Sequence, residues 1–202
     1  MTPVKHILLS LAALLLGAHT ATASPVVGEP APDFTLKSAS GGEISLEQYA
    51  GKPVILEWTN HQCPYVGKHY GSGNMQRIQK KLTDDGAVWL SIISSAPGKQ
   101  GHVEAEKAVH LTESRGAYPT HVLLDPKGDV GRLYGARTTP HMFLIDADGT
   151  LKYKGAIDDR SSPSQDSLEG ATNYVTAAWS ALQNGEEISP RATRPYGCSV
   201  KY

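Results

Sequence analysis

Residues 57–66 read Glu-Trp-Thr-Asn-His-Gln-Cys-Pro-Tyr-Val, and the rest of the chain is best interpreted around these ten residues. It continues an apolar run that starts at residue 54, just after the turn-forming residues 51–53, and such a run is typical of a central strand. Pro64 suits the first turn of a helix, because its ring fixes a helical φ and its missing N–H is not needed there. Cys63 therefore stands where a buried strand ends and a helix begins.

A cysteine at that junction is a candidate nucleophile. It lies beside unpaired backbone N–H groups and the positive end of the helix dipole, and both favour the thiolate over the thiol. Glu57, six residues earlier, is a candidate proton carrier, because a carboxyl group in an apolar strand needs a hydrogen-bonding partner or a proton. The alternative is that Glu57 lies on a solvated face of the strand.

Three motifs in this order resemble the redoxins, the superfamily that joins alkyl hydroperoxide reductases to thioredoxin-like proteins. Residues 25–36, which include Gly-Glu-Pro-Ala-Pro-Asp-Phe-Thr-Leu, resemble the redoxin opening. The acid six residues before a cysteine at a helix start resembles the thioredoxin active site. Residues 138–146, Thr-Thr-Pro-His-Met-Phe-Leu-Ile-Asp, resemble the cis-proline loop and the strand after it. The resemblance spans residues 25–156 and implies an α/β thioredoxin-like fold, with a central mixed sheet flanked by helices.

The resemblance also implies a role for each residue of the site. Cys63 would attack a sulfur or peroxide, and Glu57 would move the proton. Pro140 would follow a cis peptide bond and shape a substrate groove, to which Thr139 and His141 would contribute. The implied partners are protein thiols or disulfides, or a peroxide, together with a thiol reductant. No cofactor is implied.

The chain departs from the family pattern in two places. A Cys-x-x-Cys motif would need a second cysteine where this chain has Val66. The peroxiredoxin signature would need proline and threonine or serine where this chain has Leu56 and Asn60. Arg137 could by position replace the arginine that stabilises a peroxidatic thiolate, but surface solvation is the simpler interpretation. Neither disulfide exchange nor peroxide reduction therefore carries over unchanged. The predicted function is a thiol-disulfide oxidoreductase, and a thiol peroxidase that uses the same cysteines is the alternative.

Cysteine content and the N-terminal sequence together suggest a redox pair. Residues 1–23 have a basic start, an apolar run at 7–16 and a small-residue end, which predicts a signal peptide and export to the periplasm or beyond the cell. Only Cys63 and Cys198 are present, and disulfides persist in such compartments. Cys198 would resolve the intermediate formed on Cys63. A purely structural bridge, which would stabilise the fold by about 5 kcal/mol, is the alternative.

The mature chain has the length of one domain, which we expect at residues 24–185, followed by a tail at 186–202. The tail has no periodicity, yet it carries Cys198 with Gly197 beside it, and glycine permits close backbone approach. We therefore expect the tail to fold back toward Cys63. With 19 basic and 20 acidic residues, the chain shows no charge bias toward nucleic acid, and no stable membrane association is predicted for the mature form.

Three histidines, His61, His69 and His141, could lie near Cys63. An imidazole there could stabilise the thiolate, carry protons or join the sulfur in binding copper, as in some redoxin relatives that are copper carriers. Those relatives use two nearby cysteines, so a copper-binding carrier is a further alternative and no metal ligand is assigned. For each histidine taken singly, a surface or hydrogen-bonded role is the simpler interpretation.

Overall fold

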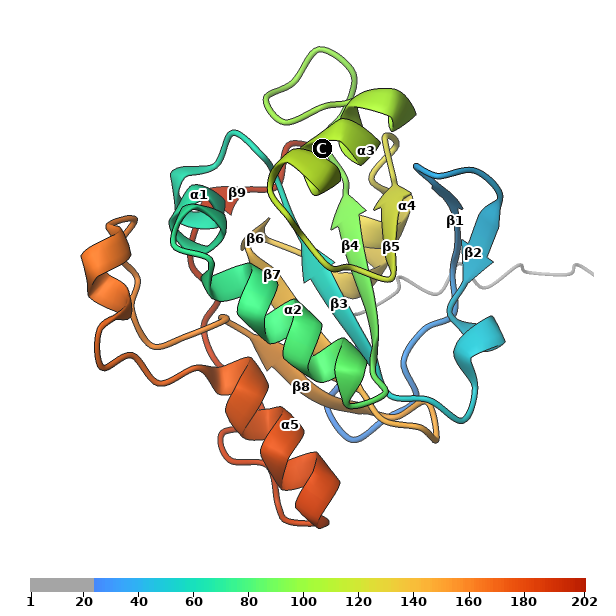
Figure 1. The fold of residues 1–202 in the computed structure, drawn as a ribbon. Coiled ribbons are helices and arrows are strands. Elements are labelled where there is room, and N and C mark those ends of the chain that lie inside the picture. The colour runs from blue at the N-terminus through green and yellow to red at the C-terminus, as the bar shows by residue number, and fades with distance from the viewer. Residues whose placement is uncertain (1–23) are drawn as a thin grey trace, which may run out of the picture.

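The computed structural model describes residues 24–202 (Figure 1). The expected signal peptide, residues 1–23, lies outside the described residues. The main sheet has seven strands in the order β2-β1-β5-β4-β3-β7-β8, and a second sheet pairs β6 with β9. The strands are β1 Thr35–Ser38, β2 Glu43–Ser45, β3 Val54–Trp58, β4 Val88–Ile93, β5 His121–Leu124, β6 Thr138–Thr139, β7 His141–Ile145, β8 Leu151–Gly155 and β9 Cys198–Ser199. The helices are α1 Pro64–Gly71, α2 Asn74–Asp84, α3 Ala105–Ser114, α4 Asp129–Tyr134 and α5 Tyr174–Asn184, with short 3-10 turns at Glu47–Tyr49 and Gln165–Leu168.

The central strand β3 is buried along its whole length, as its apolar sequence predicts. It pairs in parallel with β4 and antiparallel with β7, so the sheet is mixed. β4 continues in parallel to β5, and β8 and the β1–β2 hairpin extend the two sides with antiparallel pairs. This arrangement confirms the predicted α/β fold with a central mixed sheet.

Side chains of β3 alternate between two cores on opposite faces of the sheet. Leu56 and Trp58 pack in the core that contains Tyr134 of α4. Ile55 packs in the other core, formed with α2 and α5, to which α2 contributes the predicted apolar face of Met75, Ile78 and Leu82. Since successive residues of a strand point to opposite faces, Glu57 shares the α2 face with Ile55.

Two helix starts differ from what the sequence predicts. The sequence predicts one helix over about residues 168–183, but the chain forms a 3-10 turn that ends at Leu168, and α5 begins only at Tyr174. Asn173 explains this start, because its side chain accepts the N–H of Thr176 as an N-cap. The sequence also predicts that Ser45 caps a short helix through Tyr49, but Ser45 ends β2, and the Asp33 carboxylate accepts the N–H of Glu47 instead.

The tail, residues 186–202, runs back over the domain, as Figure 1 shows in red near α1 and β6. The Thr193 hydroxyl bonds the hydroxyl of Tyr153, β9 pairs with β6, and the Tyr202 hydroxyl donates to the carbonyl of Ala136. The predicted return of the tail toward the cysteine loop is confirmed. Across residues 24–202, none of the helices combines the length and apolar character that crossing a bilayer requires.

Candidate active site

Cys63 occupies the N-cap of α1, with extended dihedrals (φ −82°, ψ 122°) and Pro64 in the first helical turn, as the sequence predicts. Its carbonyl accepts the N–H of Gly67 at 2.8 Å, which closes the first turn. Its side chain is 1% exposed, and the thiol donates to the carbonyl oxygen of Thr139 at 3.1 Å. The cysteine is therefore held at the helix start but covered.

The loop facing Cys63 contains the cis-proline that the sequence predicts: the Thr139–Pro140 peptide bond is cis. Thr139 belongs to β6, and in the β6–β9 register it lies opposite Cys198. Gly197 has φ +133°, and a β-carbon there would collide with the Thr139 carbonyl oxygen, so glycine is required at this close approach. Thr139 thus accepts the Cys63 thiol through its carbonyl and pairs with Cys198 across the β6–β9 ladder.

The two cysteines are free thiols in this structure, and each alters the acidity of the other. Burial alone would raise the pKa of Cys63, but hydrogen bonds, first among them that of the Cys198 side chain, outweigh it and hold the pKa below its ordinary value. Burial, the same hydrogen bond and the charge of Cys63 raise the pKa of Cys198 to about 11. Cys63 is therefore the more acidic thiol of the pair, and the Cys198 side chain favours its deprotonated form.

Glu57 is fully buried, which confirms the prediction and rules out the solvated face. Its Oε2 accepts hydrogen bonds from the side chains of Gln79 at 3.1 Å, Trp89 at 2.9 Å and Ser91 at 2.8 Å. The Tyr70 hydroxyl lies 3.0 Å from Oε1 and 3.2 Å from Oε2. Among the described residues, none of the hydrogen bonds of Glu57 reaches Cys63, so any proton transfer between them is indirect.

A small cavity, about 30 Å³, lies beside this carboxylate. Tyr70 and Ser91, which both bond Glu57, line it together with Thr59 and His61. Within residues 24–202, Thr59 Oγ1 and His61 Nδ1 are buried atoms without a hydrogen-bond partner. The cavity has space for about one water beside these polar groups.

Replacing Glu57 with Gln should slow thiol chemistry about tenfold and destabilise the protein by about 1–3 kcal/mol, because a buried amide presents two N–H donors to groups that also donate. The rate of disulfide reduction measured from pH 6 to 9, with urea unfolding of the same sample, tests both effects. Ser91→Ala is the matched control, since it removes one donor and keeps the carboxyl. Unchanged kinetics in Glu57→Gln at every pH would remove Glu57 from the mechanism.

The other predicted residues have interaction partners other than Cys63. His141 is buried against Phe143, its Nδ1 faces the N–H of Arg137, and burial lowers the pKa of His141 to about 3, so it is neutral. Arg137 itself is exposed and is absent from the groups that shift the Cys63 pKa. Both ring nitrogens of His69 bond other side chains. Across residues 24–202, no three His, Cys, Asp or Glu side chains cluster as metal ligands.

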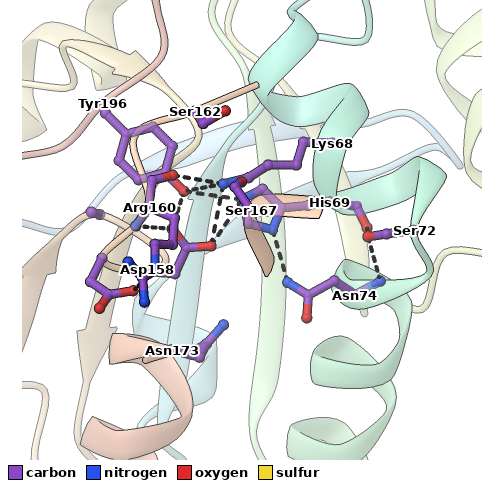
Figure 2. Close-up of polar contacts among 12 residues, drawn as sticks. Lys68, His69, Ser72, Asn74, Asp158, Arg160, Ser162, Ser167, Asn173 and Tyr196 are labelled. Atoms are coloured by element: carbon purple, nitrogen blue, oxygen red, sulfur yellow. Dashed lines mark hydrogen bonds and ion pairs between the residues drawn. The ribbon is translucent and has the colours of Figure 1, made fainter. Parts of the chain in front are cut away.

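Several residues of this site are not evident from the sequence. The Glu57 carboxylate accepts hydrogen bonds from Gln79, Trp89 and Ser91. The sequence features that could have indicated them are a serine inside the apolar run of β4 and a glutamine on the apolar face of α2. Figure 2 shows a second polar cluster, in which Lys68 and Asp158 meet Tyr196 of the tail. Its only sequence signal is the motif that Tyr196 shares with Cys198.

Comparison with known proteins agrees with a thioredoxin-fold redox site. The AhpC/TSA family model matches residues 27–154, and the chain belongs to that family. A thioredoxin-like protein from Bacillus subtilis, YneN, is 28% identical over 125 residues, which cover 62% of this chain and 68% of YneN. The thiol-disulfide oxidoreductase ResA of Bacillus thuringiensis is 25% identical, covering 68% of this chain and 74% of ResA. A probable phospholipid hydroperoxide glutathione peroxidase of Solanum lycopersicum is 29% identical, covering 65% and 82%.

Solved structures show the same fold. An uncharacterised conserved protein from Geobacillus kaustophilus superposes with a TM-score of 0.75 at 24% identity, covering 88% of this chain and 92% of its own. A putative thiol:disulfide interchange protein DsbE from Chlorobium tepidum gives a TM-score of 0.51 at 27% identity, covering 65% and 85%. The thioredoxin-like fold implied by the sequence is therefore confirmed.

Proposed function

We propose that this chain is an exported thiol-disulfide oxidoreductase in which Cys63 attacks and Cys198 resolves. The observation that carries the proposal is the β6–β9 register, which sets Cys198 opposite Thr139, the residue whose carbonyl receives the Cys63 thiol. Because the pKa of Cys63 is lowered and the pKa of Cys198 is raised, we assign Cys63 as the nucleophile and Cys198 as the resolving thiol. The relatives that are named oxidoreductases support the same class of reaction.

In the reducing direction the chemistry takes two exchanges. The Cys63 thiolate attacks one sulfur of a substrate disulfide, which releases the other as a thiolate and leaves a mixed disulfide. Cys198 then loses its proton and attacks the Cys63 sulfur, so the substrate leaves fully reduced and the protein holds a Cys63–Cys198 disulfide. The released substrate thiolate takes up that proton, and an external thiol reductant restores the two cysteines. Protein disulfides are the proposed substrates.

Access to Cys63 requires the tail to move, because a side chain that is 1% exposed cannot meet a protein disulfide. The tail contacts Cys63 through Cys198, so tail release would couple to the redox state. Glu57, buried behind the site, would accept or return a proton through Tyr70 or the adjoining cavity. Pro140 and Thr139 would form the edge on which the substrate chain lies.

A redox titration tests the proposal. Equilibration with graded thiol buffers, followed by trapping of free thiols, should give a Cys63–Cys198 potential between about −270 and −120 mV, the range of thioredoxin and its oxidising relatives. Limited proteolysis of residues 186–202 should be faster in the reduced protein. A potential below about −300 mV without tail release would make Cys198 a structural staple and overturn the proposal. Export is part of the proposal and rests on residues 1–23.

A thiol peroxidase is the second candidate. It is favoured by the peroxidase relative, and by the burial of Cys63, because a small peroxide can reach a buried sulfur more easily than a protein can. The Cys63 thiolate would attack a peroxide oxygen, release an alcohol or water and become a sulfenic acid. Cys198 would condense with it to give the disulfide and water. Peroxide consumption with a thiol reductant that is lost in Cys63→Ser would favour the peroxidase, whereas insulin reduction without peroxide consumption would favour the oxidoreductase.

A further inference from the structure

A buried charged cluster joins α1 to the segment that follows β8 (Figure 2). The side chains of Lys68 and Asp158 are both 0% exposed, with Lys68 Nζ 3.5 Å from Asp158 Oδ2 and 2.7 Å from the carbonyl of Arg160. His69 Nε2 lies 3.7 Å from the same carboxylate oxygen. Buried charges are costly, so a cluster of this kind is retained where each member has a partner.

The Tyr196 hydroxyl from the tail completes this cluster. It donates to Asp158 Oδ1, and it lies 3.1 Å from Lys68 Nζ and 3.2 Å from His69 Nε2. Asn74 Nδ2 lies 2.8 Å from His69 Nδ1, so the amide donates there and the histidine proton sits on Nε2, directed at Tyr196. Burial lowers the pKa of His69 to about 4, which keeps the ring neutral. One donated and two accepted bonds use the full capacity of the hydroxyl.

The same helix that begins at Cys63 therefore holds the tail two residues before Cys198. The Tyr196 ring also packs against Tyr65, with ring centroids 5.8 Å apart, and Lys68 Nζ lies 5.0 Å from the centre of the Tyr196 ring. None of these residues takes part in the sulfur chemistry. Their shared property is that they fix the position of the segment that carries Cys198.

We propose that Tyr196 is a positioning residue, held by Lys68, His69 and Asp158, that sets the effective concentration of Cys198 at Cys63. The inference rests on the proposed function. Docking of Tyr196 and closure of the disulfide order the same tail segment, so whichever forms first removes part of the entropy cost of the other. The coupling is reciprocal. Loss of the Tyr196 contacts lowers the equilibrium constant for disulfide formation by some factor, and reduction of the disulfide weakens the Tyr196 contacts by the same factor.

The first test compares the disulfide equilibrium in Tyr196→Phe with that in Tyr202→Phe. The first variant removes the hydroxyl in the cluster and keeps the ring on Tyr65. The second removes a tail hydroxyl that donates to the Ala136 carbonyl, outside the cluster. In the graded thiol buffers, Tyr196→Phe should lower the equilibrium constant for closing the Cys63–Cys198 disulfide about tenfold, which makes the potential about 30 mV less negative. Tyr202→Phe should change the constant less than threefold. Equal constants in wild type and Tyr196→Phe, or equal losses in both variants, would overturn the inference.

The second test does not depend on the disulfide. In a Cys198→Ser background, iodoacetamide should alkylate Cys63 about tenfold faster when Tyr196→Phe is added, because the tail then uncovers the sulfur. Adding Tyr202→Phe should leave the rate within threefold, and urea unfolding of each variant separates tail release from loss of the fold. If the wild-type bridge never forms, the proposed function fails while this alkylation result still decides the role of Tyr196. An unchanged alkylation rate would overturn that role.

Discussion

Replacing Cys198 with Ser should stop catalysis after one chemical step and leave the substrate attached to Cys63. The first attack needs only the Cys63 thiolate, whereas release of the substrate needs a second thiolate. Serine keeps the shape of the side chain, so β9 should still pair with β6. Incubation with an oxidised protein or peptide, followed by acid trapping and intact-mass measurement, should show a mixed disulfide on most of the variant and on little of the wild type.

The matched variant Cys63→Ser should form no adduct, and its rate of disulfide reduction should fall by a factor on the order of 10³ or more, because a serine hydroxyl without an activating base is a poor nucleophile. Steady turnover of Cys198→Ser at the wild-type rate would show that an external thiol resolves the intermediate. Adducts on Cys198 in the Cys63→Ser protein would reverse the assignment of nucleophile and resolving thiol.

Replacing Asp158 with Ala should destabilise the folded protein by about 3–5 kcal/mol, the usual cost of leaving a buried charge without its partner. Burial already lowers the pKa of Lys68, and the Asp158 carboxylate opposes that effect. Without it, Lys68 would bind its proton more weakly in the folded chain than in the unfolded chain. Stability then rises with pH, so the loss should be smaller near pH 9 than near pH 7. Urea unfolding at the two pH values measures both effects.

Two further variants separate charge burial from general damage. Lys68→Met in the Asp158→Ala background removes the uncompensated charge and should recover part of the lost stability. Asp84→Ala breaks the ion pair of Asp84 with Lys80, whose side chains are 63% and 56% exposed, and should barely change stability. A small loss in Asp158→Ala that is independent of pH would mean that water reaches Lys68 in the folded protein.

The residues that make up the central sheet are readily predicted from the sequence, because an apolar run has few alternatives to a buried strand. The strand at Val88–Ile93 and the end of the first helix at Gly71 follow from composition and glycine placement alone. The β1–β2 hairpin, by contrast, has a polar or exposed pattern that gives no strand periodicity. The start of α5 was misplaced because Leu168 is apolar, whereas the capping effect of Asn173 depends on its side-chain geometry.

The site could be predicted only in part, for a physical reason. Cys63, Glu57 and Pro140 lie within local patterns, so their places follow from neighbours in sequence. Lys68 and Asp158 are 90 residues apart, and a lysine or an aspartate alone is usually solvated. The burial of Lys68 and Asp158 depends on tertiary packing. The role of Tyr196 depends on the same packing, because Tyr196 bonds these two residues.

The β6–β9 pair has a consequence for how the protein should be handled. Within residues 24–202, β6 has β9 as its sole strand partner, and each of the two strands is two residues long. Once the tail leaves, the main-chain groups of β6 form an open edge, and at high protein concentration that edge can pair with the β9 segment of a neighbouring molecule. Concentrated, reduced samples should therefore contain dimers with exchanged tails, which reoxidation would lock through Cys63 of one molecule and Cys198 of the other. Such dimers should disappear on dilution before oxidation, and size-exclusion chromatography at two protein concentrations would reveal them.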